Sequence, residues 1–140
     1  MSQNARLQSL GAFQSLLFRL PLLGNPVVRG LNRAVAYAAF YTPVVGGKRA
    51  TTIADVKKGW LAFLERAGVT PVVTADGKMS FQWEVEACPY GFCKAEQRGV
   101  CDAVMDMDRT YTKLLGGELV IHDRLADGAD RCRFTTKLRA

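Results

Sequence analysis

The first 54 residues carry no acidic side chain, and this absence constrains the fold more than any other feature of the sequence. They contain six Lys or Arg residues and are otherwise rich in Leu, Phe, Val and Ala. The remainder begins at the first carboxylate, Asp55, and has 13 basic and 13 acidic residues. The formal charge of +6 therefore belongs to the N-terminal part alone. We expect two regions: a basic, apolar, helical leader over residues 1–50 and a neutral domain over residues 51–140.

The leader has the pattern of two amphipathic helices. Apolar residues recur at three- and four-residue steps from Leu7 to Leu20, which predicts the first helix. Pro21 and the Gly-Asn-Pro segment at residues 24–26 end it, with Asn25 as the expected N-cap of a second helix. A Thr-Pro pair at residues 42–43 is expected to stop that helix. No uncharged apolar run reaches the roughly 18–20 residues that a membrane-spanning helix needs.

Such a leader is expected to decide where the protein sits. Basic amphipathic helices can lie in a membrane interface or bind a larger protein, and packing on the rest of the chain is the alternative. We expect a larger protein complex or a membrane surface as the partner, reached through residues 1–50. The location would be the cytoplasmic side, peripheral to a membrane or a membrane complex, in a reducing compartment. Basic residues spread through an apolar segment argue against nucleic acid.

Residues 51–140 indicate an α+β fold with a mostly antiparallel sheet of two hairpins. A helix is expected between a capping Thr52 and a terminating Gly68. The Asp-Gly pair at residues 76–77 predicts a hairpin, and the strand after it alternates apolar and polar residues. A helix over residues 100–115 is expected to precede a second hairpin over residues 118–138.

Four cysteines, Cys88, Cys93, Cys101 and Cys132, carry the predicted chemistry, with the spacing C-x4-C-x7-C-x30-C. Four thiolates can hold an iron–sulfur cluster or a structural zinc ion. Zinc sites usually have two tight cysteine pairs, so the irregular spacing favours a [4Fe–4S] cluster, with zinc as the alternative cofactor. Two disulfides in a secreted chain and four ordinary buried thiols are the other interpretations.

Three residues are candidates for nucleophilic or acid–base roles. Cys101 is expected near a helix N-terminus, where the helix dipole favours the thiolate. Asp106 follows on the same helix, and His122 is the only histidine of the chain. The alternatives are a carboxylate that solvates its helix and a partly exposed histidine on a strand.

The cysteine segments also carry a family resemblance. The Cys-Pro-Tyr segment at residues 88–90, Cys101, and the Gly-x-Asp-x-Cys-x-Phe pattern at residues 128–134 resemble the L-2-amino-thiazoline-4-carboxylic acid hydrolase-like family. The same pattern, over residues 80–138, is similar to vinyl-reductase-type small-ligand-binding domains. The resemblance implies cysteines gathered at one end of an antiparallel sheet around a small-molecule or metal site. It points to Cys88, Cys101, Asp106 and Cys132, and Cys93 is an addition that would complete a cluster-binding set.

The sequence therefore predicts a small iron–sulfur protein attached to a membrane or a membrane complex, acting in electron transfer or as an accessory subunit. On its own it is not expected to be an enzyme. One alternative is a hydrolase of a small C–N or C–S substrate. The other is a vinyl-reductase-type small-ligand sensor with an apolar pocket lined by Phe81, Trp83 and Tyr111.

Overall fold

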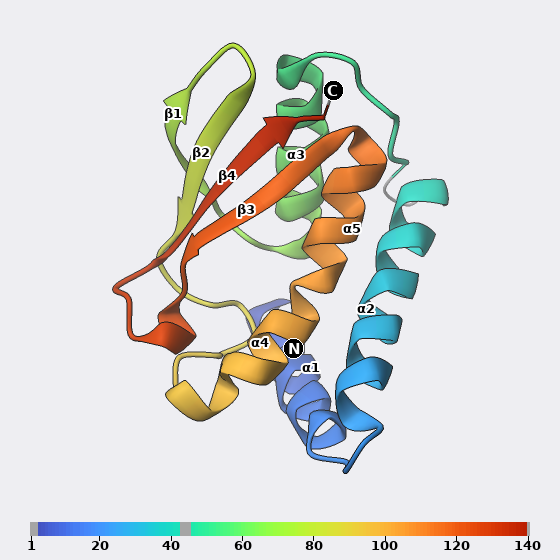
Figure 1. Ribbon diagram of the computed structural model, residues 1–140, viewed down its shortest axis with the longest axis vertical. Helices are drawn as coiled ribbons and strands as arrows, with labels where there is room; N and C mark the ends of the chain where they lie inside the picture. The colour runs from blue at the N-terminus through green and yellow to red at the C-terminus, as the bar shows by residue number, and fades with distance from the viewer. Residues whose placement is uncertain (1–2, 43–45, 140) are drawn as a thin grey trace.

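The computed structural model describes residues 3–42 and 46–139, and it places helices against one face of a four-stranded antiparallel sheet (Figure 1). The α+β class predicted from the sequence is confirmed. The strand order is β1-β2-β4-β3, so the two hairpins join through β2 and β4. The elements are α1 (Gln3–Phe18), α2 (Gly24–Tyr41), α3 (Ile53–Ala67), β1 (Val72–Asp76), β2 (Ser80–Val85), α4 (Arg98–Val104), α5 (Asp106–Leu115), β3 (Gly117–Asp123) and β4 (Cys132–Leu138), with short 3-10 helices at Ala95–Gln97 and Leu125–Asp127.

The local sequence rules hold at the boundaries of α3 and in the first hairpin. The Thr52 hydroxyl accepts a hydrogen bond from the Asp55 N–H at 3.2 Å, and Gly68 ends the helix with φ of 82°. Gly77 donates its N–H to the Ser80 carbonyl at 2.8 Å and closes the turn between β1 and β2. These are a side-chain N-cap and a left-handed C-cap, the features that the residue types predict.

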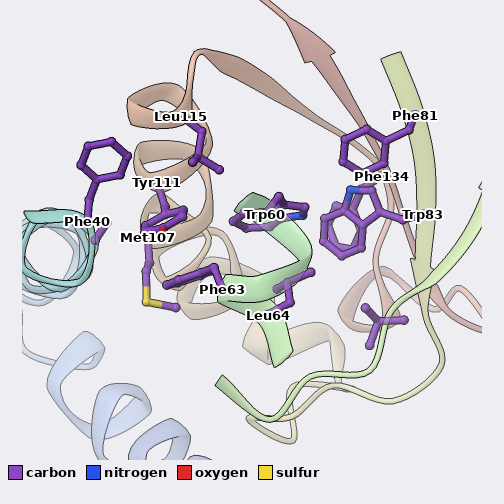
Figure 2. Close-up of a cluster of buried hydrophobic side chains, with 12 residues drawn as sticks. Phe40, Trp60, Phe63, Leu64, Phe81, Trp83, Met107, Tyr111, Leu115 and Phe134 are labelled. Carbon is purple, nitrogen blue, oxygen red and sulfur yellow. The ribbon is translucent and has the colours of Figure 1, made fainter. Parts of the chain in front are cut away.

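An aromatic core lies between the sheet and the helices (Figure 2). Phe63 of α3 stacks on Tyr111 of α5 with ring centroids 4.0 Å apart. On the sheet, Trp83 stacks on Phe134 at 4.2 Å, and its indole N–H donates to the Thr136 hydroxyl at 3.1 Å. Alternate residues of β2 face this core, so the predicted alternation of buried apolar and more exposed polar residues along the strand is also confirmed.

The two leader helices form a further layer, and α2 contributes to the core itself. Val28 and Ala36 are fully buried, and the ring of Phe40 lies edge-on to Tyr111. Helix α1 packs on α2 through a buried hydrogen bond of 2.5 Å from the Asn32 amide to Gln14 Oε1. The division at residue 50 stays a prediction, because these contacts do not show whether the parts fold separately. No helix within residues 3–42 and 46–139 is long and apolar enough to cross a membrane.

Two helix boundaries differ from the sequence prediction. Helix α2 begins at Gly24, and its N-cap Leu23 has no side-chain hydrogen bond, so Asn25 is not the cap. The single helix expected over residues 100–115 is divided at Met105 into α4 and α5. Its backbone there, with φ of −63° and ψ of −11°, departs from regular α-helix in ψ. The predicted stop at Pro43 lies outside the described residues.

We predict that Phe40→Ala destabilises the whole chain. Phe40 is only 7 % exposed, and removing a buried phenylalanine side chain costs about 3–5 kcal/mol. The neighbouring Tyr41 is 70 % exposed, so Tyr41→Ala is the matched control and should change the free energy of unfolding by less than about 1 kcal/mol. Urea denaturation followed by tryptophan fluorescence measures both, since Trp60 and Trp83 lie in the body of the chain. An unchanged midpoint for Phe40→Ala would mean that α2 is not coupled to the core.

Candidate functional site

An apolar cavity of about 70 Å³ lies where α1, α3, α4 and α5 meet the end of the sheet. Residues from distant parts of the chain line it: Leu7, Phe63, Leu64, Ala67, Val69, Trp83, Val85, Cys88, Pro89, Tyr90, Phe92, Cys101, Val104, Met105, Met107, Asp108, Cys132 and Phe134. Helix α1 forms part of the wall through Leu7. It also lies tightly against the loop after β2, since a Cβ on Gly11 would collide with the backbone of Tyr90.

Three of the four cysteines line this cavity. Cys88 follows β2, Cys101 lies on α4, and Cys132 begins β4. The Cys132 sulfur accepts a hydrogen bond of 3.4 Å from the Leu125 N–H. All four cysteines are free thiols. The prediction that cysteines gather at one end of the sheet therefore holds for these three residues.

Burial keeps the cavity thiols protonated at neutral pH. Burial raises the pKa of Cys101 to about 12, with a further increase from neighbouring Cys88 and an opposing effect of Arg124. Burial likewise raises the pKa of Cys88 and of Cys132. A thiol with a raised pKa is a weak nucleophile, because the thiolate is the reactive form. At neutral pH these side chains therefore form part of the apolar lining of the cavity and react only slowly as nucleophiles.

Cys93 lies apart from the other thiols. It is exposed and does not line the cavity, because the loop turns at Gly91, where φ is 78°. The Gln97 side chain accepts hydrogen bonds of 3.0 Å from the backbone N–H groups of Cys93 and Lys94. These bonds fix the loop with Cys93 outside. The cysteine spacing alone does not reveal this orientation.

Asp108 is the one carboxylate among the described residues of the cavity wall, and its place on the helix of Asp106 made it, too, a candidate for acid–base work if it pointed inward. Burial raises the pKa of Asp108 to about 7, against a weaker opposite effect of Arg109. Burial and the charge of Asp108 in turn raise the pKa of Tyr90, which also lines the cavity. A carboxyl group that holds its proton to a higher pH than usual thus lines an otherwise apolar space. An acid seven residues after Cys101, two helical turns along the same face, was the available clue.

The other predicted site residues lie elsewhere. Asp106 is 5 % exposed and points away from the cavity, toward α2. His122 is exposed on the outer face of the sheet, with Nε2 2.6 Å from the Thr135 hydroxyl oxygen. Of the three residues expected to line an apolar pocket, Trp83 does so, whereas Phe81 and Tyr111 pack in the aromatic core instead. The structure therefore does not bring Cys101, Asp106 and His122 together.

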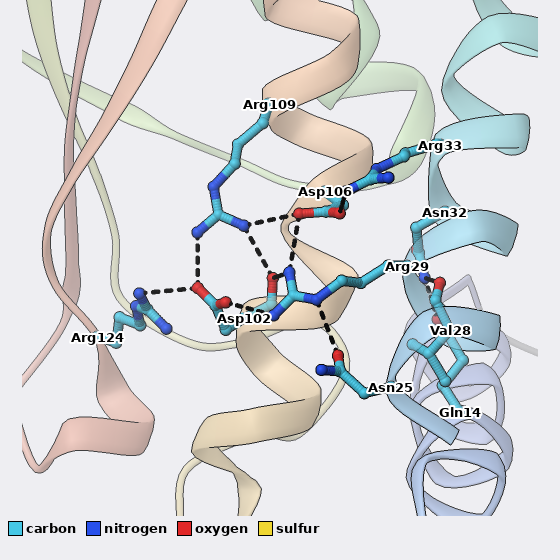
Figure 3. A network of polar contacts seen from close by, with 10 residues as sticks. All are labelled: Gln14, Asn25, Val28, Arg29, Asn32, Arg33, Asp102, Asp106, Arg109 and Arg124. Carbon is cyan, nitrogen blue, oxygen red and sulfur yellow. Dashed lines mark hydrogen bonds and ion pairs between the residues drawn. The ribbon is translucent and has the colours of Figure 1, made fainter. Parts of the chain in front are cut away.

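Asp106 and Asp102 form an ion-pair network with four arginines, Arg29, Arg33, Arg109 and Arg124 (Figure 3). Asp102 accepts from Arg109 at 2.6 Å and from Arg29 at 2.7 Å. Burial alone would raise the pKa of Asp102, but hydrogen bonds from these arginines outweigh it and lower the pKa to about 2. The role that this structure gives Asp106 is to pair with the basic helix α2.

Solved structures that share this fold include a subunit of a trafficking complex. It is trafficking protein particle complex subunit 3 from Naegleria fowleri, in a crystal structure with covalently bound palmitic acid. The two chains superpose with a TM-score of 0.63 and 12% sequence identity, over 97% of this chain and 96% of that one. At this identity the likeness shows a shared fold. No protein-family model matches the chain, and no curated protein matches it.

The predicted iron–sulfur function is wrong, and electron transfer by a [4Fe–4S] cluster falls with it. Among the residues that the structure describes, no three His, Cys, Asp or Glu side chains are grouped so that they could hold a metal ion. Cys93 faces solvent, and Cys88, Cys101 and Cys132 line one apolar cavity without being grouped closely enough to share a metal ion. The protein of the same fold holds a fatty acid.

The raised pKa of Asp108 predicts a pH-dependent stability. The folded chain holds this proton to higher pH than the unfolded chain does, so the native state binds more protons between about pH 4 and pH 7. This contribution is complete below about pH 4 and is lost as the pH rises through 7, by up to about 1.4 kcal/mol per pH unit.

We therefore expect Asp108→Asn to flatten the fall in stability between about pH 5 and pH 8. Urea denaturation at a series of pH values measures the effect. The control is Asp130→Asn, because Asp130 is exposed and its arginine neighbours lower its pKa. If the wild type and Asp108→Asn show the same pH profile, Asp108 is ionised in the folded chain at all these pH values.

Proposed function

We propose that this chain binds an acyl chain in its apolar cavity and works as a subunit of a larger, membrane-associated assembly. The observation that carries the proposal is the cavity itself, lined by three thiols, in a chain that shares its fold nearly end to end with a palmitate-bound subunit. The resemblance to small-ligand-binding domains is consistent with a ligand at this end of the sheet but does not identify one.

The wall of the cavity suits a hydrocarbon chain. Its only ionisable groups besides the thiols are Tyr90 and Asp108, and both favour their neutral forms more than usual. A volume of about 70 Å³ has space for about five water-sized groups. A short acyl chain fits this space directly. A longer chain must displace wall side chains, and the unbranched Met105 and Met107 are suited to this because methionine adapts its shape readily.

A cavity thiol can also hold the acyl group covalently. A thiolate of Cys88, Cys101 or Cys132 would attack the carbonyl carbon of an activated acyl thioester, and the donor's own thiolate would leave and take up a proton. The raised pKa values make this step slow at neutral pH. Non-covalent binding is therefore the first event, and acylation follows it.

The assembly and its location form the second part of the proposal. The protein of the same fold is a subunit of a complex. In this chain, α1 and α2 keep large apolar side chains exposed, which is a surface that a partner or a membrane can cover. The location proposed is peripheral, on the cytoplasmic side of a membrane, in a reducing compartment that suits four free thiols.

Filling the cavity should weaken acyl binding. Ala67 lines the cavity at the end of α3, so Ala67→Leu places a larger side chain in the ligand's space. We expect the dissociation constant of dodecanoate to rise about tenfold or more, a loss of at least about 1.4 kcal/mol. The matched control is Ala62→Leu, an exposed site on the same helix that should leave binding unchanged. Isothermal titration with octanoate, dodecanoate and palmitate measures both variants, and an absence of binding by all three acids would refute the proposal.

Acylation should depend on pH and on the buried thiol. With a pKa of about 12, the Cys101 thiolate fraction rises about tenfold per pH unit below that value. We therefore expect the initial rate of modification by a soluble acyl thioester to rise steeply from about pH 7 to pH 9. Intact-mass spectrometry follows the adduct. Cys93→Ser is the control and should retain the adduct, whereas modification found only at Cys93 would show that the cavity does not direct it.

A further inference from the structure

The turn between α1 and α2 lies at one end of the molecule (Figure 1), and leucines at and beside this turn are exposed. Leu22 is 96 % exposed, and Leu16, Leu20 and Leu23 are exposed by 64 %, 50 % and 63 %. We call these four residues the leucine tip. All the large apolar side chains that are exposed in the described residues, except Val72 and Met79, belong to α1, α2 and this turn. The chain therefore keeps its apolar surface in water mainly at this side.

The backbone holds the leucine tip in a defined conformation. Leu22 has φ of 64°, and no other non-glycine residue within residues 3–42 and 46–139 has a positive φ. A leucine is disfavoured in this region, where glycine is not. The Gly24 N–H donates to the Leu20 carbonyl at 3.0 Å, and the Leu23 N–H donates to the Pro21 carbonyl at 2.7 Å. A side chain at Gly24 would collide with the Phe18 carbonyl, so the turn has little room to adjust.

This conformation does not stabilise the folded chain by itself. A residue at positive φ with a fully exposed apolar side chain costs conformational energy and buries nothing, so its benefit must lie outside the chain. Backbone outliers of this kind are the ones that point to function rather than to packing. The turn thus holds Leu22 in solvent, where another surface can reach it.

The charge beside the tip indicates what that surface is. Arg19 is exposed next to Leu20, and no acidic residue occurs before Asp55. Arg29 and Arg33 are already paired with Asp102 and Asp106, so Arg19 is the leader's cation at the tip. Apolar side chains flanked by a cation are complementary to the acyl boundary and the phosphates of an anionic bilayer.

The shape of the tip supports the same occupant. The turn that carries it is the projecting end of the α1–α2 helix pair (Figure 1). A protein partner would need a matching concave pocket, whereas a bilayer deforms around a projection. We propose that the leucine tip inserts into the interfacial layer of an anionic membrane, with Arg19 at the level of the lipid phosphates. This attachment uses a different surface from the acyl cavity, and each can fail without the other.

The test is flotation of the full chain with vesicles of phosphatidylcholine, alone or with about one third phosphatidylserine. Leu22→Asp should lower binding to the anionic vesicles about tenfold or more, because burial of one leucine side chain is lost. The matched control is Met79→Asp, an exposed apolar site in the hairpin between β1 and β2, which should bind as the wild type does. Arg19→Gln should weaken binding about fivefold on anionic vesicles and leave the weaker binding to neutral vesicles unchanged.

A second variant separates membrane binding from folding. Leu22→Gly removes the side chain and relieves the positive φ, so it should raise the thermal midpoint while it lowers vesicle binding. The proposal is overturned if the wild type does not float with anionic vesicles, or if Leu22→Asp floats as well as Met79→Asp. It is also overturned if sedimentation shows a wild-type dimer that Leu22→Asp dissociates, since the tip would then be an interface between copies of the chain.

Discussion

Two carboxylates on neighbouring helices hold the basic N-terminal part of the chain in place. Asp102 and Asp106 form ion pairs with Arg29 and Arg33 of α2, at distances of 2.7 to 3.0 Å. Asp106 is buried, and a buried carboxylate is stable only when it is paired and hydrogen-bonded. The same pairing draws α2 against α4 and α5, so that Val28, Ala36 and Phe40 can enter the core. The positive charge of the leader is thus partly neutralised within the molecule.

One stretch of chain, formed by α4 and α5, serves both this network and the cavity. Asp102 and Asp106 lie on the side that faces α2, whereas Cys101 and Asp108 lie on the side that faces the sheet. The two faces differ in chemistry: one is a set of ion pairs between buried or partly exposed side chains, and the other is an apolar wall. The carboxylates on the two faces have pKa values shifted in opposite directions: arginine partners lower the pKa of Asp102, and burial raises the pKa of Asp108.

Local patterns in the sequence predict much of the fold, whereas long-range contacts determine the site. The Thr52 cap, the Gly68 terminus, the turn at Gly77 and the alternation of β2 follow from neighbouring residues. The pairing of Arg29 with Asp102 joins residues 73 positions apart, and the charge totals cannot reveal it. The metal prediction was wrong for a related reason: spacing shows that four thiols are present but not that Cys93 points away from the other three. The break at Met105 also has no marker, because neither glycine nor proline occurs there.

Helix α1 belongs to two surfaces at once. Its Leu7 is part of the cavity wall, and Gly11 fixes its distance from Tyr90, while its last turn carries part of the leucine tip. Any ligand that shifts this helix when it enters the cavity must therefore change the free energy of whatever binds the tip. By thermodynamic reciprocity, an attachment that holds the helix changes the ligand's affinity by the same factor. Because Gly11 packs tightly against Tyr90, a movement of α1 at the cavity is also a movement of the leucine tip.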